Sequence, residues 1–237
     1  MMDTRIEQLR NSSGEADTHG LSNELVDSFL KIDPNLNIAL DLAIKARENL
    51  DDEVEDLLVS LNESQFAREL QKDFVNFYEP STVNPYIPLA AKGPWIITTH
   101  GAVVHDNGGY GMLGMGHDPT EVMSSMSKSH VMANVMTPSV THKRFADTLK
   151  REVGHTRGAC PFDRFICMNS GSESVTVAMR ISDINARLMT DQEGPHQGKE
   201  IWTVALDSGF HGRTDRPASI SSSCLPKYQK KLASFRG

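Results

Sequence analysis

The sequence predicts an α/β fold, in which a helical N-terminal extension and a small α+β region precede a mostly parallel sheet. The first observation is a strand–turn–helix pattern. Arg164–Met168 is a short apolar run, Asn169–Ser172 is a turn, and apolar residues then recur with helical spacing as far as Ile184. The second observation is Glu200–Leu206, another apolar run of strand length, which leads into Asp207–Thr214. Two strands that flank one helix predict a right-handed βαβ unit with parallel strands.

The turn between the first strand and the helix has the residues of an anion site. Ser172 can cap the helix, Glu173 suits its positive end, and Gly171 lets a ligand approach the backbone. Free N–H groups at such a helix start would hold a phosphate. Since ligands bind beyond the carboxyl ends of parallel strands, Asn169–Ser172 and Gly209–Gly212 are expected to face the same crevice. A capped helix without any ligand is an equally simple interpretation of the turn alone.

The pair of motifs NSGSES (169–174) and GFHGRT (209–214) resembles the class III aminotransferases, which belong to the fold type I group and use pyridoxal 5′-phosphate. The resemblance runs from about Gly93 to the C-terminus. In that family the Ser-Gly-Ser turn and its helix bind the cofactor phosphate, and the aromatic residue before His-Gly stacks on the pyridine ring. Ser174, Val175 and Thr176 depart from the usual family pattern. The cofactor-binding residues that the resemblance implies are Ser170, Gly171, Ser172, Phe210, His211 and Gly212.

The resemblance also implies a Schiff-base lysine and an aspartate at the pyridine nitrogen, both on strands well beyond the His-Gly motif. Lys199, Lys227, Lys230 and Lys231 lack the matching context, so no catalytic residue is assigned in this chain. The sequence therefore resembles the N-terminal part of a fold type I large domain, whether as a truncated gene, a partial chain or one piece of a split enzyme. We expect the chain by itself not to transaminate.

The parent enzyme would act on a small-molecule amine or amino acid and a keto acid or aldehyde. The resemblance implies a homodimer with the cofactor at the subunit boundary, so that apolar residues within 93–140, including Met112, Leu113, Met115 and Val131, lie partly at the interface. The alternative from another class is a non-catalytic interaction protein derived from the same fold.

Composition narrows the function classes. The 237 residues carry a formal net charge of −7, which argues against a nucleic-acid partner, and no apolar run has the length of a membrane span. The N-terminus lacks the apolar core of a signal peptide. Cys160, Cys167 and Cys224 are an odd number without metal-ligand spacing, and Cys167 is expected to be buried in its strand. These features favour a cytoplasmic protein.

The first 80 residues are expected to form a helical extension. Residues 1–20 are polar and predict a poorly ordered end. Residues 22–77 carry four apolar stripes of helical spacing, with Pro34 ending the first and Asn62 or Ser64 capping the last. A helical interaction module is one interpretation. An extension that packs on the enzyme's own core or on its dimer mate is the one we favour.

Residues 81–160 are expected to lead from a small meander into the large domain, which would occupy residues 161–237. The segment Glu79–Pro88 is rich in proline and predicts an extended linker. Short strands are expected at Trp95–Thr99 and Ala102–His105. The turn Gly116–Pro119 resembles a family turn and should start a helix through Met126, with Asp118 as the cap. A further helix is expected at about 140–153.

Two other patterns in this region resemble known binding motifs but are interpreted as having no such function. Gly109–Gly114 satisfies G-x-G-x-x-G, which would suggest a nicotinamide-dependent oxidoreductase. The glycines do not open a helix, however, and no acidic residue ends a second strand about twenty positions later. His100, His105 and His117 lack any zinc-binding spacing, so hydrogen-bonded or solvated histidines are expected and no metal site is assigned.

Overall fold

The computed structural model describes residues 3–74, 86–107, 114–131 and 136–222. The chain divides into two compact units, Met1–Val131 and Met132–Gly237. Each unit is described by itself.

The first unit consists of helices and a small antiparallel sheet with strand order β1-β2-β3. In the sheet, Lys92 pairs with Trp95 across the first turn, and Ile97 pairs with Val103 across the second. The elements are α1 (Thr4–Asn11), α2 (Asn23–Leu30), α3 (Pro34–Glu48), α4 (Asp52–Ser60), α5 (Glu63–Gln71), β1 (Pro88–Lys92), β2 (Trp95–Thr98), β3 (Val103–His105) and α6 (Thr120–Met126).

Side-chain caps mark the starts of α1, α2, α3 and α5. Helix α6 begins after Pro119 without a side-chain cap, so the expected cap at Asp118 is wrong. Asp33 precedes Pro34, the first residue of α3, and its carboxylate accepts a hydrogen bond from the N–H of Asn35 at 2.9 Å. Asn62 and Gln65 form a reciprocal capping box at the start of α5. Pro34 thus starts α3 rather than merely ending the preceding stripe, and Asn62 is the predicted cap.

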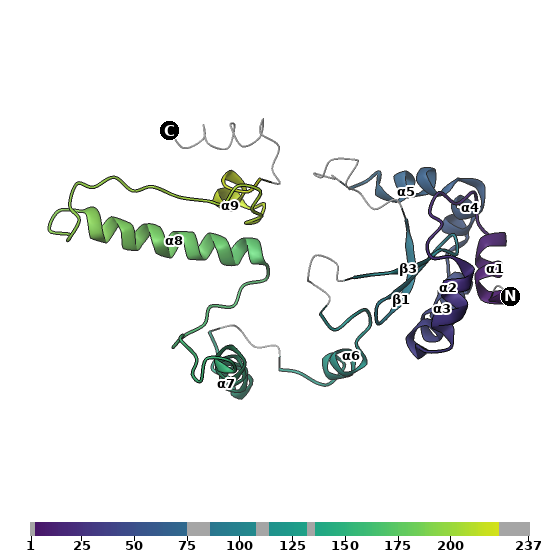
Figure 1. Ribbon diagram of the computed structural model, residues 1–237, viewed down its shortest axis with the longest axis horizontal. Coiled ribbons are helices and arrows are strands. Elements are labelled where there is room, and N and C mark those ends of the chain that lie inside the picture. Colours follow the sequence, from purple (N-terminus) through teal and green to yellow (C-terminus); the bar gives the residue numbers. More distant parts are fainter. Residues whose placement is uncertain (1–2, 75–85, 108–113, 132–135, 223–237) are drawn as a thin grey trace. The chain divides into compact units, whose positions relative to one another are not determined.

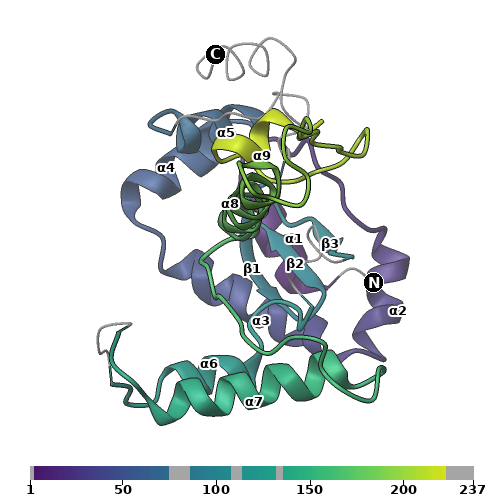
Figure 2. The same cartoon turned by 90° about the vertical axis from the view of Figure 1, so that its left-hand side faces the viewer.

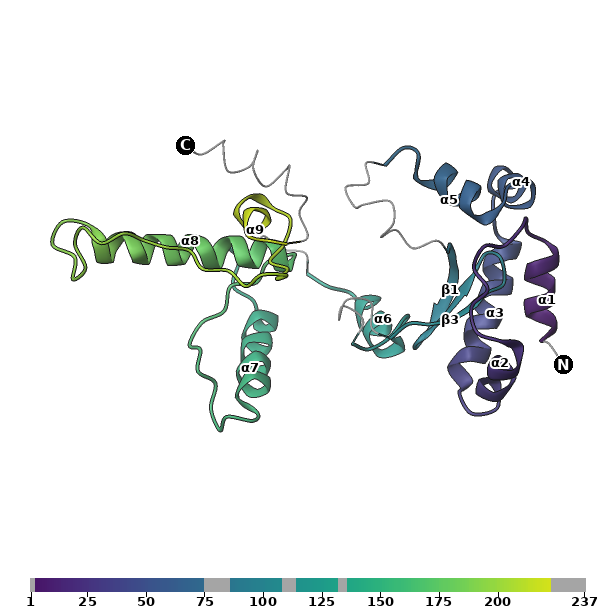
Figure 3. The same ribbon diagram turned by 45° about the horizontal axis from the view of Figure 1, so that its top comes forward.

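The core of the first unit lies between α3 and the sheet. Helix α3 packs on β1 and β2, and in Figure 3 it lies between the sheet and α1. Trp95 is 1% exposed, and its ring lies 4.9 Å from that of Phe29. The buried members of this core are Ile6, Leu9, Val26, Leu36, Ala39, Leu40, Ala43, Trp95, Ile97 and Val103.

The structure changes two expectations for this region. Residues 3–20, expected to belong to a poorly ordered end, are held in place, because α1 places Ile6 and Leu9 in the core, where they anchor the helix. The last residue of the predicted linker, Pro88, begins the strand β1 (Pro88–Lys92), which was not predicted and pairs with the expected strand at Trp95. Helix α3 of the expected extension packs on the sheet of its own unit, and that the extension also covers a large domain stays a prediction.

The second unit contains α7 (Val140–Gly154), α8 (Gly171–Thr190) and α9 (Asp215–Ser219). Both α7 and α8 were predicted. The segment after α8 turns and runs back along that helix, and α9 lies beside its N-terminal half (Figures 1 and 2). The carboxylate of Asp183 on α8 forms an ion pair with Arg216 on α9, which fixes the two helices together.

The predicted parallel sheet is wrong for the described part of the second unit. Neither Arg164–Met168 nor Glu200–Leu206 has regular secondary structure, and the described strands are all antiparallel. A buried strand needs neighbours on its edges and apolar cover on its faces. Here Trp202 is 80% and Val204 90% exposed, so the described residues of this unit do not provide the cover that such strands need.

The accessibility of the Cys167 thiol tests whether Arg164–Met168 is a buried strand. Cys167 was expected to be buried in a strand, but it is exposed. We predict that iodoacetamide alkylates Cys167 in the native chain about as fast as in the denatured chain, because no packing restricts access to the sulfur. Peptide mass spectrometry over a time course measures both rates. Strong protection of Cys167 in the native chain would restore the buried-strand interpretation.

Candidate functional site: the first turn of α8

The turn before α8 forms a capped helix start. Ser170 is the N-cap residue, and its Oγ accepts a hydrogen bond from the N–H of Glu173 at 3.2 Å. The carboxylate of Glu173 reaches back and accepts from the N–H of Asn169 at 3.0 Å. The cap is therefore Ser170 rather than Ser172, which had been expected in that role. Small polar residues suit this position because their oxygen atoms satisfy N–H groups that the helix leaves unpaired.

The same helix start leaves two donors available to an anion. Within the described part of the chain, no hydrogen bond uses the N–H of Gly171 or of Ser172. A Cβ added to Gly171 would meet no atom within 4 Å, so the backbone there is open to a ligand. The positive end of the helix dipole favours a negative group at this point.

The second motif contacts this turn through Ser172. The Oγ of Ser172 accepts a hydrogen bond from the N–H of Arg213 at 3.2 Å, and its carbonyl accepts one from the hydroxyl of Thr214, also at 3.2 Å. The hydroxyls of Thr176 and Thr214 lie 3.1 Å apart. The two segments, about forty positions apart in sequence, are thus joined through Ser172 and Thr176, which lie in the first two turns of α8.

Gly212 allows this close contact. Its φ is +115°, which residues with a side chain rarely adopt, and an added Cβ would lie 2.5 Å from the Oγ of Ser172. Glycine is required at this position on both grounds.

Phe210 and His211 lie in the loop that leads into this contact. The phenyl ring of Phe210 is 65% exposed, while the N–H of His211 donates to Ser221 Oγ at 3.0 Å. The N–H of Ser222 donates to the carbonyl of Gly209 at 2.9 Å and closes the loop. The structure therefore brings Ser172 together with Gly212, whereas Phe210 extends toward solvent.

Sequence reasoning passed over the residues that make these bonds. Arg213 and Thr214 were seen as parts of the second motif, and Thr176 as a departure from the family pattern, but none of the three as a site residue. The hydroxyl groups of Thr176 and Thr214 could have indicated this role, because threonine side chains commonly form hydrogen bonds with nearby backbone groups. Ser221, which fixes the loop, stands in the run Ser221–Ser223 and gave no signal of its own.

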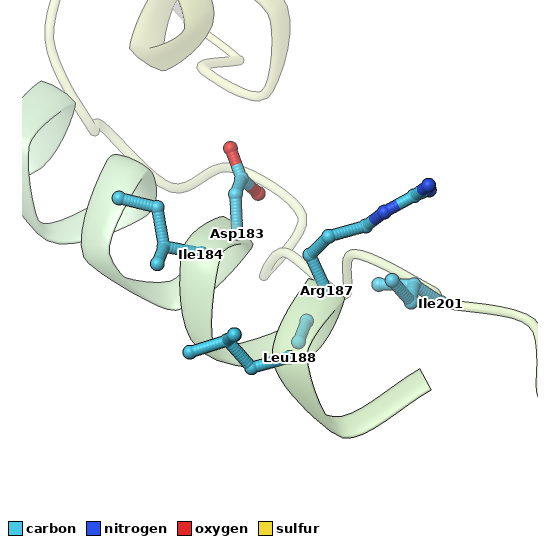
Figure 4. A pocket seen from close by; sticks show the side chains of 6 residues that line it. Asp183, Ile184, Arg187, Leu188 and Ile201 are labelled. Atoms are coloured by element: carbon cyan, nitrogen blue, oxygen red, sulfur yellow. The ribbon is translucent and has the colours of Figure 1, made fainter. Parts of the chain in front are cut away.

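A separate cavity of about 500 Å³ lies farther along α8, lined by Asp183, Ile184, Ala186, Arg187, Leu188 and Ile201. Figure 4 shows Ile184 and Leu188 on the helix and Ile201 on the returning segment. Ile184 is twelve residues from Ser172, which corresponds to about 18 Å along the helix axis. The cavity is thus remote from the helix start and is mainly apolar.

Other candidate sites in the described residues are not supported. No group of histidine, cysteine and carboxylate side chains there could hold a metal ion, and no described helix is long and apolar enough to cross a membrane. His100, His105 and His117 each have a hydrogen-bond partner, as expected. The dinucleotide-like pattern, apart from Gly114, lies outside the described residues, as do Cys224, Lys227, Lys230 and Lys231.

Comparison with known proteins identifies the family. Residues 77–236 match the family Aminotransferase class-III, and the chain belongs to this family. A 75-residue stretch is 36% identical to an acetylornithine aminotransferase from Prochlorococcus marinus subsp. pastoris, covering 32% of this chain and 16% of that protein. The chain therefore matches a minor part of that relative's length. No solved structure gives a significant match.

The family match suggests which anion the start of α8 could bind. Class-III aminotransferases use pyridoxal 5′-phosphate and act on amino acids and keto acids. The free N–H groups of Gly171 and Ser172 and the open space beside Gly171 fit a phosphate group. The carboxylate of Glu173 is the one negative group that the described contacts place at this helix start.

Proposed function

We propose that the first turn of α8 and the segment Phe210–Gly212 bind the phosphate and ring of pyridoxal 5′-phosphate, as part of a class-III-like aminotransferase that acts as a homodimer. The reaction of that enzyme would move an amino group from an amine or amino acid to a keto acid or aldehyde. When bound, the cofactor supplies the electron sink for this transfer. The proposed binding residues are Ser170, Gly171, Ser172, Phe210, His211 and Gly212.

One contact carries the proposal: the hydrogen bond from the N–H of Arg213 to the Oγ of Ser172 at 3.2 Å. It joins the two family motifs at the helix start that has free N–H groups. A phosphate at this point would accept hydrogen bonds from Gly171 and Ser172 and would interact with the helix dipole. The exposed ring of Phe210, on the same loop as Arg213, is available for stacking on a pyridine ring.

We also propose that residues 1–237 do not transaminate by themselves. Amino transfer needs an amine that moves a proton at the substrate carbon. Lys199 follows the turn that ends α8, whereas Ser172 lies in the first turn of this 20-residue helix. A helix of that length spans about 30 Å, so Lys199 is far from the proposed phosphate site.

Binding of pyridoxamine 5′-phosphate tests the proposed site. This form of the cofactor carries an amine and does not condense with lysine side chains, so its retention reports non-covalent binding. We predict that Gly171→Asp lowers the affinity at least tenfold in isothermal titration calorimetry, because a carboxylate then faces the phosphate. The acidic side chain itself suits the first turn of a helix, so α8 should remain folded.

Ser182→Asp is the matched control. Ser182 is an exposed residue near the middle of α8, about 16 Å along the axis from Gly171, and the same charge there should leave the affinity unchanged. Inorganic phosphate should compete with pyridoxamine 5′-phosphate in the unaltered chain. Equal affinities in both variants, or binding that phosphate does not displace, would contradict the proposed phosphate site.

A non-catalytic interaction protein of the same fold is the second candidate. The observation that favours it is the exposure of large apolar side chains on α8, including Ile181 at 54% and Leu188 at 68%. Such exposed patches are typical of surfaces that bind other polypeptides. Failure of the unaltered chain to bind pyridoxamine 5′-phosphate would favour this candidate over a cofactor-binding role.

A further inference from the structure

A buried polar cluster lies in the first unit, partly outside the region that matches the family. The carboxylate of Glu63 is 0% exposed and the imidazole of His100 is 1% exposed. Among the described residues, Glu63 Oε1, His100 Nε2 and Thr18 Oγ1 are buried atoms without a hydrogen-bond partner. Buried polar atoms that lack partners carry an energetic cost, so a cluster of them calls for an explanation in the molecule.

Glu63 binds the segment that connects α1 with α2. Its Oε2 accepts hydrogen bonds from the N–H groups of Asp17 at 2.9 Å and Thr18 at 2.7 Å, while its own N–H donates to the carbonyl of Glu15 at 2.9 Å. In return, the carboxylate of Asp17 accepts from the N–H of Ser64 at 3.0 Å. Residues 15–18 are thereby fixed to the first turn of α5.

His100 reaches the cluster from the sheet. It lies two residues after the end of β2, and its ring lies 6.4 Å from that of Phe66, which stands three residues after Glu63 on α5. Residues three apart share a helix face, so Glu63 and Phe66 present the same side of α5. The Nδ1 of His100 pairs with the hydroxyl of Thr99 at 2.9 Å, which leaves Nε2 without a partner.

The connecting segment also contacts the sheet. The N–H of Leu21 donates to the carbonyl of Val103 on β3 at 2.8 Å. An added Cβ at Gly20 would lie 2.5 Å from the same carbonyl oxygen, so the backbone runs directly against the strand. Residues 15–21 thus join α5 to the three-stranded sheet, with the Glu63–His100 cluster at the junction.

We propose that residues 15–18, Glu63 and His100 form an acid-sensitive latch between the N-terminal helices and the sheet. The latch is closed while His100 is neutral. Protonation of His100 places a second charge among buried groups, and the latch opens by releasing residues 15–18 from α5.

The charges that face His100 set the direction of this response. Burial lowers the pKa of His100 below its ordinary value, Glu63 and Asp17 act to raise it, and Arg47 acts to lower it. The net shift is downward, so the open chain binds a proton that the closed latch resists. Closure is fully favoured above the ordinary pKa of 6.5 and is progressively lost as the pH falls below that value.

Hydrogen exchange of the whole chain tests the latch. We expect protection of the N–H groups of Asp17 and Thr18 to fall by up to about tenfold between pH 6.5 and 5.5, after correction for intrinsic exchange rates. His100→Gln removes the titrating group and should abolish this pH dependence. His155→Gln, which alters an exposed histidine after α7, should keep it. An equal loss of protection in His100→Gln, or none in the unaltered chain, would refute the latch.

A second measurement does not depend on how the variants fold. In nuclear magnetic resonance spectra of the unaltered chain, the ring protons of His100 and the amide signals of Asp17 and Thr18 should change with one common midpoint below pH 6.5. Independent midpoints for the ring and the amides would overturn the proposed coupling. A shared midpoint above pH 6.5 would reverse its direction and would overturn it equally.

Discussion

Trp95→Ala is expected to destabilise the first unit by about 3–5 kcal/mol, the usual cost of removing a large aromatic side chain from a core. Trp95 is 1% exposed, and its ring lies 4.9 Å from that of Phe29 and 4.8 Å from that of His105. The substitution also removes the hydrogen bond from Nε1 to the carboxylate of Asp33 at 2.8 Å. Because a domain's total stability is about 5–15 kcal/mol, this loss leaves the unit close to unfolding.

Hydrogen exchange of the slowest amides in α3 measures this effect, since α3 packs directly on the strand that carries Trp95. Trp202→Ala is the matched control, because Trp202 is 80% exposed in the second unit. Its removal should change the opening free energy by less than about 0.5 kcal/mol. If the two substitutions had similar effects on α3, Trp95 could not belong to the core of the first unit.

Most of the longer helices and the strands β2 and β3 were predictable because their signals are local. Asn62 and Gln65 carry the capping box in the sequence itself, and the helix start at α5 follows from it. The strand at Trp95 is a run of β-forming residues bounded by a glycine and a proline. Such features depend on neighbouring residues alone, so no knowledge of the tertiary structure was needed.

Burial was not predictable in the same way. The stretches at Arg164–Met168 and Glu200–Leu206 have the composition of buried strands, yet a strand forms only where partner strands and an apolar cover are present. Within the described residues of the second unit, Ala218 is the one buried hydrophobic residue. Conversely, α1 looked too polar to be ordered, because its two core residues, Ile6 and Leu9, form too short a stripe to stand out.

The candidate site likewise contains features that the sequence predicted and features that it did not. The sequence motifs predicted that the helix start would be capped and that the second motif would lie near it. They could not predict that Ser172 would accept the N–H of Arg213, since this contact depends on the path of a loop about forty residues away. The cap at Ser170 is a local contact with Glu173, and the spacing of these two residues already indicates it. The role of Gly212 is likewise visible only when its contact with Ser172 is known.

Gly212→Ala is expected to separate the two motifs. The new Cβ would lie 2.5 Å from the Oγ and 2.8 Å from the Cα of Ser172, so the loop must move away from α8. The φ of +115° adds strain of about 1–3 kcal/mol for a residue with a side chain. Deuterium uptake of a peptide covering residues 207–222 should rise, because the N–H of Arg213 loses its hydrogen bond to Ser172. Affinity for pyridoxamine 5′-phosphate should fall at least tenfold.

Gly198→Ala separates the effect of strain from that of the contact. Gly198 also has a positive φ, +74°, but an added Cβ there would meet no atom within 4 Å. This control should therefore show the cost of backbone strain without any movement of the loop from Ser172, and its peptide 207–222 should exchange as in the unaltered chain. If Gly212→Ala left both the exchange of that peptide and the cofactor affinity unchanged, the contact between Gly212 and Ser172 could not be what holds the two motifs together.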